Sequence, residues 1–122
     1  LSRAALMTAS LWSGSLDNLR VAVQDRLHQP YRFPLIPGAE QVFYTAYSLG
    51  AYAVAISGAG PSILAIIEGG NDAFVPQAAA ALHEAGLTGW RVEVFGCDSR
   101  GATVEFGVPS PIESTQSEPE VN

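Results

Sequence analysis

The chain has 122 residues, the length of one domain, and a net charge of −6 from 12 acidic residues and 6 basic ones, all of them Arg. A nucleic-acid-binding module would show a basic patch, and a membrane-surface helix would carry Lys or Arg on its polar face, so the composition argues against both. The single cysteine, Cys97, excludes a disulfide within the chain and argues against a cysteine-based zinc site.

The first forty residues favour helices separated by Gly and Pro. Residues 2–13 have helical composition and are apolar nearly all round, which predicts a buried helix that ends at Gly14. Apolar residues recur at spacings of three and four from Leu16 to Leu27, which predicts one face of a second helix. Three prolines between residues 28 and 37 argue against regular helix or central strand in that segment.

The remainder mixes strands and helices. The expected elements are a helix ending at Gly50, buried strands at 53–56 and 63–67 around a turn at 57–62, a helix from Asn71 or Asp72 to Ala85, and alternating strands at 90–95 and 102–106 joined by a turn at 98–101. This order predicts an α+β domain in which helices cover one side of a mostly antiparallel sheet.

The composition changes near the C-terminus. Residues 109–122 are polar, acidic and contain Pro, which predicts a disordered tail after a folded domain at 1–108. No apolar stretch approaches the roughly 18 residues that span a bilayer. Nothing in the sequence requires an oxidising compartment, so we expect a cytoplasmic protein.

The turn I-S-G-A-G-P-S, residues 56–62, is the first segment that could carry chemistry. Its two glycines allow positive φ or close approach of a ligand, its consecutive N–H groups could form an anion-binding nest, and Ser57 and Ser62 add hydroxyl groups. A tight hairpin whose glycines serve turn geometry alone explains the pattern equally well. A dinucleotide-binding loop fits less well, because a third glycine and a following helix are absent.

The second segment, residues 25–38, has three prolines that present Arg26, His28, Tyr31 and Arg32 on a rigid, irregular backbone. Two Arg and one His within seven residues suit a carboxylate or phosphate site, because the guanidinium fork binds an anion through two bonds. For Arg26 and His28 we favour the alternative of a helix C-terminus, where positive side chains complement the dipole. That explanation does not reach Arg32, which lies between prolines.

The other candidates have simpler explanations. His83 has no metal-ligand partner one helical turn away, so we expect a surface residue. Cys97 has no paired His in the sequence and is expected to be a small buried residue. Trp12 and Trp90 are expected in the core.

The two segments together resemble a known family. S-G-A-G-P-S, preceded and followed by apolar strands, resembles the third sequence motif of the GHMP kinase superfamily. D-R-L-H-Q-P-Y-R-F-P-L-I-P-G, about twenty residues upstream, resembles the homoserine kinase branch of that superfamily. The resemblance runs from about residue 1 to residue 107.

The resemblance implies a ferredoxin-like antiparallel sheet packed against helices, as in the C-terminal domain of these kinases. It also implies transfer of the γ-phosphoryl group of ATP to L-homoserine, giving O-phospho-L-homoserine on the route to threonine. Arg32 matches the arginine that binds the substrate carboxylate, and the glycine loop at the active-site cleft is matched by Gly58, Ala59, Gly60 and Ser62. His28 and Ser57 lie in the same segments without an assigned contact, and the resemblance assigns no catalytic base or metal ligand here.

The phosphate-binding loop of these kinases, P-x-x-x-G-L-G-S-S, does not occur in this sequence. We therefore expect ATP and Mg²⁺ to be bound mainly by an N-terminal GHMP kinase half outside this chain, and the chain alone to be inactive. The 48% apolar content fits a surface for that half or a homodimer face. Two alternatives stay open: another GHMP kinase with a different acceptor such as mevalonate, and a ferredoxin-like regulatory module that binds an amino acid.

Overall fold

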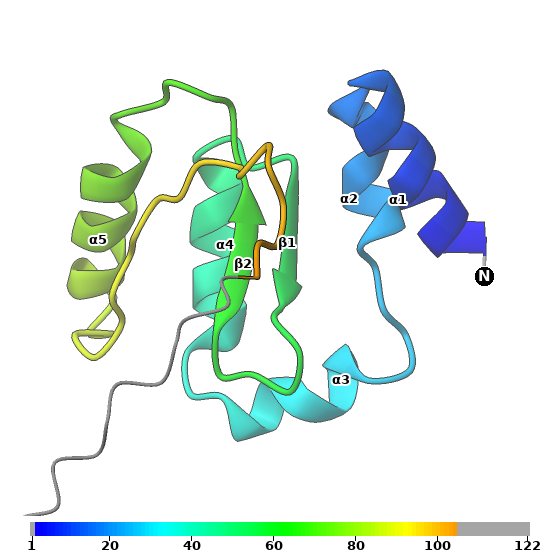
Figure 1. Ribbon diagram of the computed structural model, residues 1–122. Helices are drawn as coiled ribbons and strands as arrows, with labels where there is room; N and C mark the ends of the chain where they lie inside the picture. Colours follow the sequence, from blue (N-terminus) through cyan, green and yellow to red (C-terminus); the bar gives the residue numbers. More distant parts are fainter. Residues whose placement is uncertain (1, 105–122) are drawn as a thin grey trace, which may run out of the picture.

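The computed structural model describes residues 2–104, which form five α-helices and a two-stranded sheet (Figure 1). The elements in chain order are α1 (Ser2–Ser13), a 3₁₀ turn (Leu16–Asn18), α2 (Leu19–Ala22), α3 (Gln29–Arg32), a second 3₁₀ turn (Phe33–Leu35), α4 (Ala39–Ser48), β1 (Ala53–Ile56), β2 (Ile63–Ile66) and α5 (Phe74–Glu84). Within this part of the chain, no helix is both long and apolar enough to cross a membrane. The expected boundary at 108 and the tail at 109–122 lie outside the described residues.

The sheet is an antiparallel hairpin, as the two apolar runs predict. Ala53 lies opposite Ile66 and Ile56 lies opposite Ile63, and the N–H of Ser57 donates to the carbonyl of Ser62 at 2.8 Å. Figure 1 shows α4 beside this hairpin and α5 on the far side of α4 from α1 and α2. The α+β class, with an antiparallel sheet packed against helices, is therefore confirmed.

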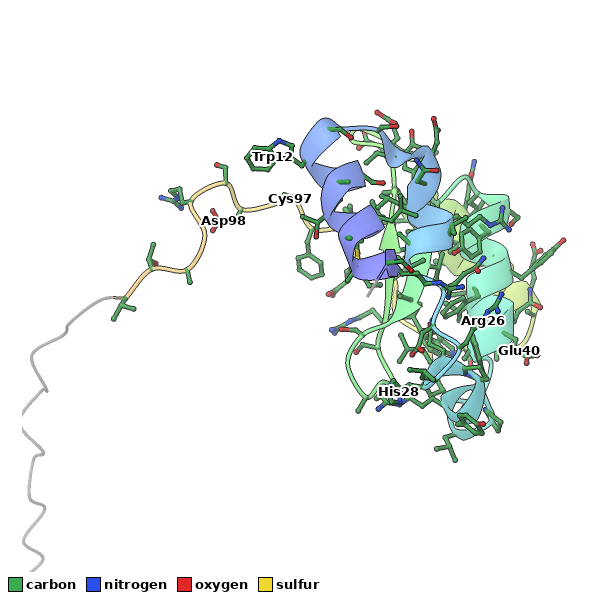
Figure 2. The ribbon with its side chains drawn as sticks, turned by 90° about the vertical axis from the view of Figure 1, so that its right-hand side faces the viewer. Trp12, Arg26, His28, Glu40, Cys97 and Asp98 are labelled. Atoms are coloured by element: carbon green, nitrogen blue, oxygen red, sulfur yellow. The ribbon has the colours of Figure 1, made fainter. Side chains whose placement is uncertain are left out.

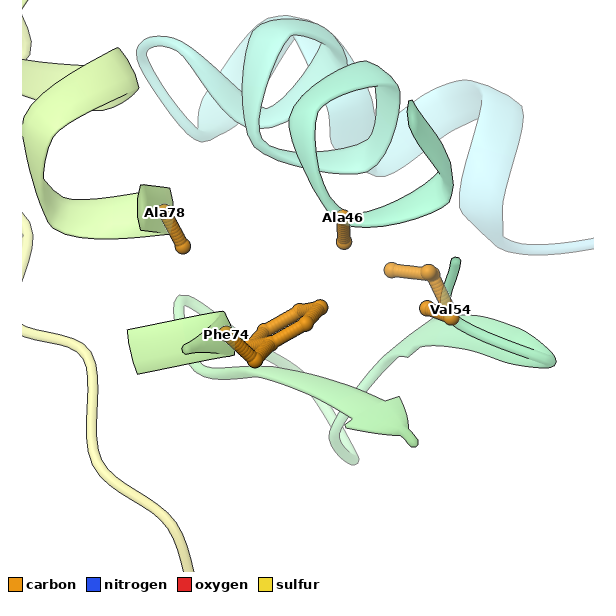
Figure 3. Packing of buried hydrophobic residues seen from close by; sticks show 5 residues of the cluster. Ala46, Val54, Phe74 and Ala78 are labelled. Atoms are coloured by element: carbon orange, nitrogen blue, oxygen red, sulfur yellow. The ribbon is translucent and has the colours of Figure 1, made fainter. Parts of the chain in front are cut away.

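The core lies between the hairpin and helices α4 and α5. Its buried members are Ala46, Ala51, Val54, Phe74 and Ala78. Figure 3 shows the ring of Phe74 between the helix that carries Ala46 and the strands below it. Small alanines on the helices let the backbones approach the sheet, and one aromatic ring fills most of the space between them.

Tyr47 connects α4, α2 and β1 at the edge of β1 that faces away from β2. Its hydroxyl oxygen accepts a hydrogen bond from the N–H of Val54 at 3.1 Å, and the guanidinium carbon of Arg20 lies 4.3 Å from the centre of its ring. The cation–π contact ties α2 to α4, and the hydrogen bond satisfies a strand N–H that faces away from β2. The outer edge of β1 is thus closed by a side chain at this position.

Helix α1 has the predicted bounds, but the expectation that it is buried is wrong. Only Ser10 is buried, and Trp12, expected in the core, has 92% of its surface exposed. The helix packs on the 3₁₀ turn and α2, which cover one side of it. Leu11 and Trp12 stay exposed on its other side, so composition alone misjudged its environment.

The second helix is much shorter than the spacing of apolar residues predicts. It ends at Ala22 instead of Leu27, whose side chain is exposed. The carboxylate of Asp25 accepts hydrogen bonds from the N–H groups of Leu27, His28 and Gln29, at 2.7 to 3.2 Å. These bonds satisfy the backbone locally and replace the helical ones, as Asp side chains do in turns.

The prolines do not exclude helical structure between residues 28 and 37, contrary to our expectation. Pro30 lies at the start of α3, and Pro34 lies at the start of the 3₁₀ turn that follows. At these positions a backbone N–H has no helical partner to lose, so single turns tolerate proline. The segment is therefore two consecutive helical turns.

The two strands predicted after α5 are absent from the described residues. Residues 88–104 contain no helix or strand, and positions 105–106 of the second predicted strand lie outside this range. Phe95 and Val94 are 83% and 66% exposed, and Cys97, expected to be buried, is also exposed. The alternation at 90–95 brings Arg91 and Glu93 to one side, where they form an ion pair at 3.1 Å. Alternation without a bonded partner strand does not produce a strand.

Candidate functional site

The turn between β1 and β2 is a tight, hydrogen-bonded loop. The N–H of Gly60 donates to the carbonyl of Ser57 at 2.9 Å, and both Gly58 and Gly60 have positive φ, +57° and +81°. The N–H groups of Ser57 and Gly60 therefore point into the hairpin and are not available to a phosphate. An anion at this turn would have to use its other N–H groups and the exposed hydroxyl of Ser62.

Gly60 is required by close packing as well as by its backbone conformation. A Cβ atom at this position would lie 2.7 Å from Cδ1 of Ile36 and 3.2 Å from Cγ2 of Ile56. Ile36 is 6% exposed, so its side chain has little room to move. The proline-containing segment thus packs directly against the glycine turn, and the two segments form one unit.

Arg32 is the side chain that brings the two segments together. It is the last residue of α3, is half-buried, and its guanidinium donates a hydrogen bond to the carbonyl of Gly58. Figure 1 shows α3 at the same end of the molecule as the connection between β1 and β2. A guanidinium has several N–H donors in a planar fork, so this contact leaves donors for an anionic ligand.

The other predicted site residues lie on the surface around this contact. Ser57, Gly58, Ala59 and Ser62 are exposed in the turn. His28 is exposed at the start of α3, and Figure 2 shows it at the end of the molecule where the two strands are connected. The interpretation of Arg26 and His28 as helix C-terminal residues is wrong, because α2 ends at Ala22.

Asp25 fixes the backbone that leads into α3. The hydrogen bond from the Leu27 N–H, together with those from His28 and Gln29, lowers the pKa of this carboxyl from its usual 3.8, because each bond favours the charged form. Asp25 is not among the residues that the sequence predicts for the site. An Asp two to four residues before a Pro-containing turn is a recognisable signal for such a loop.

Gln29 is the second residue that sequence reasoning missed. Its side-chain nitrogen Nε2 donates to the carbonyl of Val23 at 3.2 Å, and its Oε1 accepts the N–H of Ile56 at 3.1 Å. The half-buried amide therefore connects the end of α2 to the outer edge of β1. No local pattern could have revealed this, because the partners are 6 and 27 residues away in the sequence.

A cavity of about 560 Å³ lies elsewhere, between β2, α4, α5 and residues 89–95. It touches the glycine turn only at Pro61 and Ser62, and Arg32 does not line it. Its walls are mostly apolar, with Phe74 and Val92 among them. We interpret it as the gap beside β2 where residues 90–95 have not joined the sheet, because its walls are mostly apolar and its two charged lining residues, Arg91 and Glu93, pair with each other.

Comparison with known proteins decides the family. Residues 4–88 match the family described as GHMP kinases C terminal, which covers more than half of the chain. The chain belongs to the GHMP kinases. The match includes α3, the glycine turn and both strands, so the unit around Arg32 lies entirely within the GHMP domain.

Relatives of this GHMP kinase domain carry the name homoserine kinase. The protein of Clostridium beijerinckii is 44% identical over 107 residues, which cover 88% of this chain and 36% of the relative. That of Nostoc sp. is 44% identical over 99 residues, 80% of this chain and 33% of the relative, and that of Thermus thermophilus is 46% identical over 81 residues, 66% and 28%. The chain thus spans about a third of the length of these relatives. No solved structure matches it.

Proposed function

We propose that this domain is the C-terminal part of a homoserine kinase, which phosphorylates L-homoserine in threonine biosynthesis in the cytoplasm. In this reaction the side-chain hydroxyl oxygen bonds to the γ-phosphorus of ATP, the bond between that phosphorus and the bridging oxygen breaks, and the hydroxyl proton leaves. O-phospho-L-homoserine and ADP are the products. The relatives named homoserine kinase, at 44% and 46% identity, support this substrate.

The contact of Arg32 with the glycine turn is the observation that carries the proposal. Its guanidinium is held at the carbonyl of Gly58, which directs a positive charge to one end of the turn. In the proposed role this fork binds the carboxylate of L-homoserine, while Gly58, Ala59, Gly60 and Ser62 form the wall beside it. His28 and Ser57 lie at the margin of the same site and have no assigned contact.

ATP and Mg²⁺ belong to the proposal for the full-length enzyme and not to a step assigned to this chain. Within residues 2–104, no group of three or more His, Cys, Asp or Glu side chains could hold a metal ion. We assign nucleotide and metal binding mainly to an N-terminal GHMP kinase half, and expect the chain alone to be inactive.

An acceptor panel tests the proposal on the full-length protein. ADP release is measured with Mg²⁺-ATP and L-homoserine, mevalonate, galactose or no acceptor, and we expect turnover that depends on L-homoserine. Arg32→Ala should raise the KM for L-homoserine roughly tenfold or more, because a charge-assisted hydrogen bond contributes about 1.5–3 kcal/mol. Arg100→Ala, at an exposed arginine outside the site, should leave the KM unchanged. Turnover with mevalonate or galactose instead, or an unchanged KM in Arg32→Ala, would contradict the assignment.

A further inference from the structure

We propose that Gln29 is a positioning residue that holds Arg32 in the orientation needed to bind the substrate carboxylate. The proposal rests on the role of Arg32 given above. It concerns a side chain that is bonded at both ends of its amide and that the proposed reaction does not otherwise use.

The first step is the pairing of Gln29 with β1. The N–H of Ser57 bonds to Ser62 across the hairpin, and inward and outward N–H groups alternate along an antiparallel strand. The N–H of Ile56 therefore faces outward, where Oε1 of Gln29 accepts it at 3.1 Å. This bond fixes the position of α3 along β1, at the last residue before the glycine turn begins.

The second step is the short distance along the chain between this bond and the one made by Arg32. Gln29 and Arg32 are the first and last residues of the single turn α3, and their partners, Ile56 and Gly58, are two residues apart. The two bonds thus hold α3 to the strand end at two points. With the first bond removed, only the contact of Arg32 and the packing of Ile36 against Gly60 would hold α3 at the strand end.

The third step is the anchoring of Gln29 itself. Its Nε2 donates to the carbonyl of Val23, and its own N–H donates to the carboxylate of Asp25, both at 3.2 Å. Side chain and backbone are therefore both held from the α2 side. An amide held in this way leaves α3 little freedom to move relative to the edge of β1.

The test is a double-mutant cycle on the full-length protein. Gln29→Met keeps the length of the side chain and removes both hydrogen bonds. It should raise the KM for L-homoserine about tenfold, because the N–H of Ile56 loses its partner and Arg32 is held less firmly. The kcat should change less than about threefold, because the reacting groups are untouched. Gln77→Met, at an exposed glutamine on α5, is the matched control and should change neither constant.

The decisive comparison uses the Arg32→Ala background. If Gln29 acts through Arg32, Gln29→Met should then raise the KM less than about twofold further, because the group that it positions is gone. An equal increase in both backgrounds would overturn the role of Gln29 while leaving the homoserine kinase assignment intact. Absence of homoserine-dependent ADP release in the unmutated protein would instead overturn the proposed function and, with it, this role.

Amide hydrogen exchange gives a second readout that does not depend on turnover. In Gln29→Met the Ile56 amide should exchange faster, whereas the Val54 amide, which bonds to Tyr47, should keep its rate. An unchanged rate at Ile56 would contradict the proposal. If Gln29→Met does not fold, Gln29→Asn, which keeps a polar amide but is one methylene too short to reach both partners, takes its place with the same expectations.

Discussion

Two regions of the molecule contain segments with strand-like sequences, but only one of these regions is packed. The packed region, residues 19–84, contains every buried apolar residue of the described chain, including Val54 at 1% exposure and Phe74 at 6%. In the open region, residues 88–104, only Trp90 and Val92 are half-buried and all other residues are exposed. Figure 2 shows the part of this region around Cys97 and Asp98 extending away from the helices and the hairpin.

A segment with a strand pattern forms a strand only where the edge of another strand is available to pair with it. The run at 53–56 finds its partner ten residues later, across a turn that glycines close, and two helices cover the pair. The run at 90–95 has no partner of this kind, and its own backbone groups stay outside the ladder. Its apolar side chains therefore bury little surface, although Val and aromatic residues of this kind favour strands.

A pair of phenylalanine variants should show the largest difference in stability between the packed region and the open region. Phe74→Ala should lower the free energy of unfolding by about 3–5 kcal/mol, because it empties the centre of the core. Phe95→Ala, at 83% exposure, should change it by less than about 0.5 kcal/mol. Urea denaturation of the full-length protein measures both. Equal losses in the two variants would mean that residues 88–104 are packed in solution.

A pair of glycine variants compares the stability cost of a side chain at two positions inside the packed region. Gly58→Ala should lower the unfolding free energy by about 1–2 kcal/mol through its positive φ alone, since a Cβ there meets nothing within 4 Å. Gly60→Ala should cost about 1–3 kcal/mol more because its Cβ overlaps Ile36. Adding Ile36→Val, which removes Cδ1, should recover part of that extra cost. A Gly60→Ala variant no less stable than Gly58→Ala would contradict the packing described here.

The smallest effect concerns one aspartate in each region. The lowered pKa of Asp25 means that its charged form stabilises the fold above the usual value of 3.8, and that this contribution is lost as the pH falls through the folded-state pKa. Unmutated protein should therefore be more stable than Asp25→Asn at pH 7, and the difference should close below about pH 4. Asp98→Asn, in the open region, is the control, and unfolding free energies from pH 7 to pH 3 measure both. A difference for Asp25 that is independent of pH would contradict the mechanism.

Much of the packed region could be predicted from the sequence. Gly and Pro bound the runs that form β1 and β2, and Gly50 and Gly86 follow α4 and α5 with positive φ, as helix-ending glycines do. The errors about burial share one physical cause, which is that the environment of a side chain depends on partners elsewhere. Trp12 and Cys97 have core-like chemistry but no element of the described chain to cover them.

The candidate site was predictable in its segments and not in its contacts. The glycines and the prolines identify both segments, and the arginine between prolines is the side chain that joins them. The roles of Asp25 and Gln29 depend on where α2 stops and on which N–H groups of β1 face outward. The role of Gln29 does not follow from local spacing, because it requires the register of the hairpin relative to α3, whereas the hydrogen bonds of Asp25 are local.

Closing the outer edge of β1 with side chains has a consequence for how the protein behaves at high concentration. An open strand edge offers unpaired N–H groups to a strand from another chain and so promotes aggregation. Here Tyr47 and Gln29 occupy the outward N–H groups of Val54 and Ile56, so an incoming strand would have to displace both side chains first. The same amide that holds α3 in place thus also protects the hairpin from pairing with its neighbours in a crowded solution.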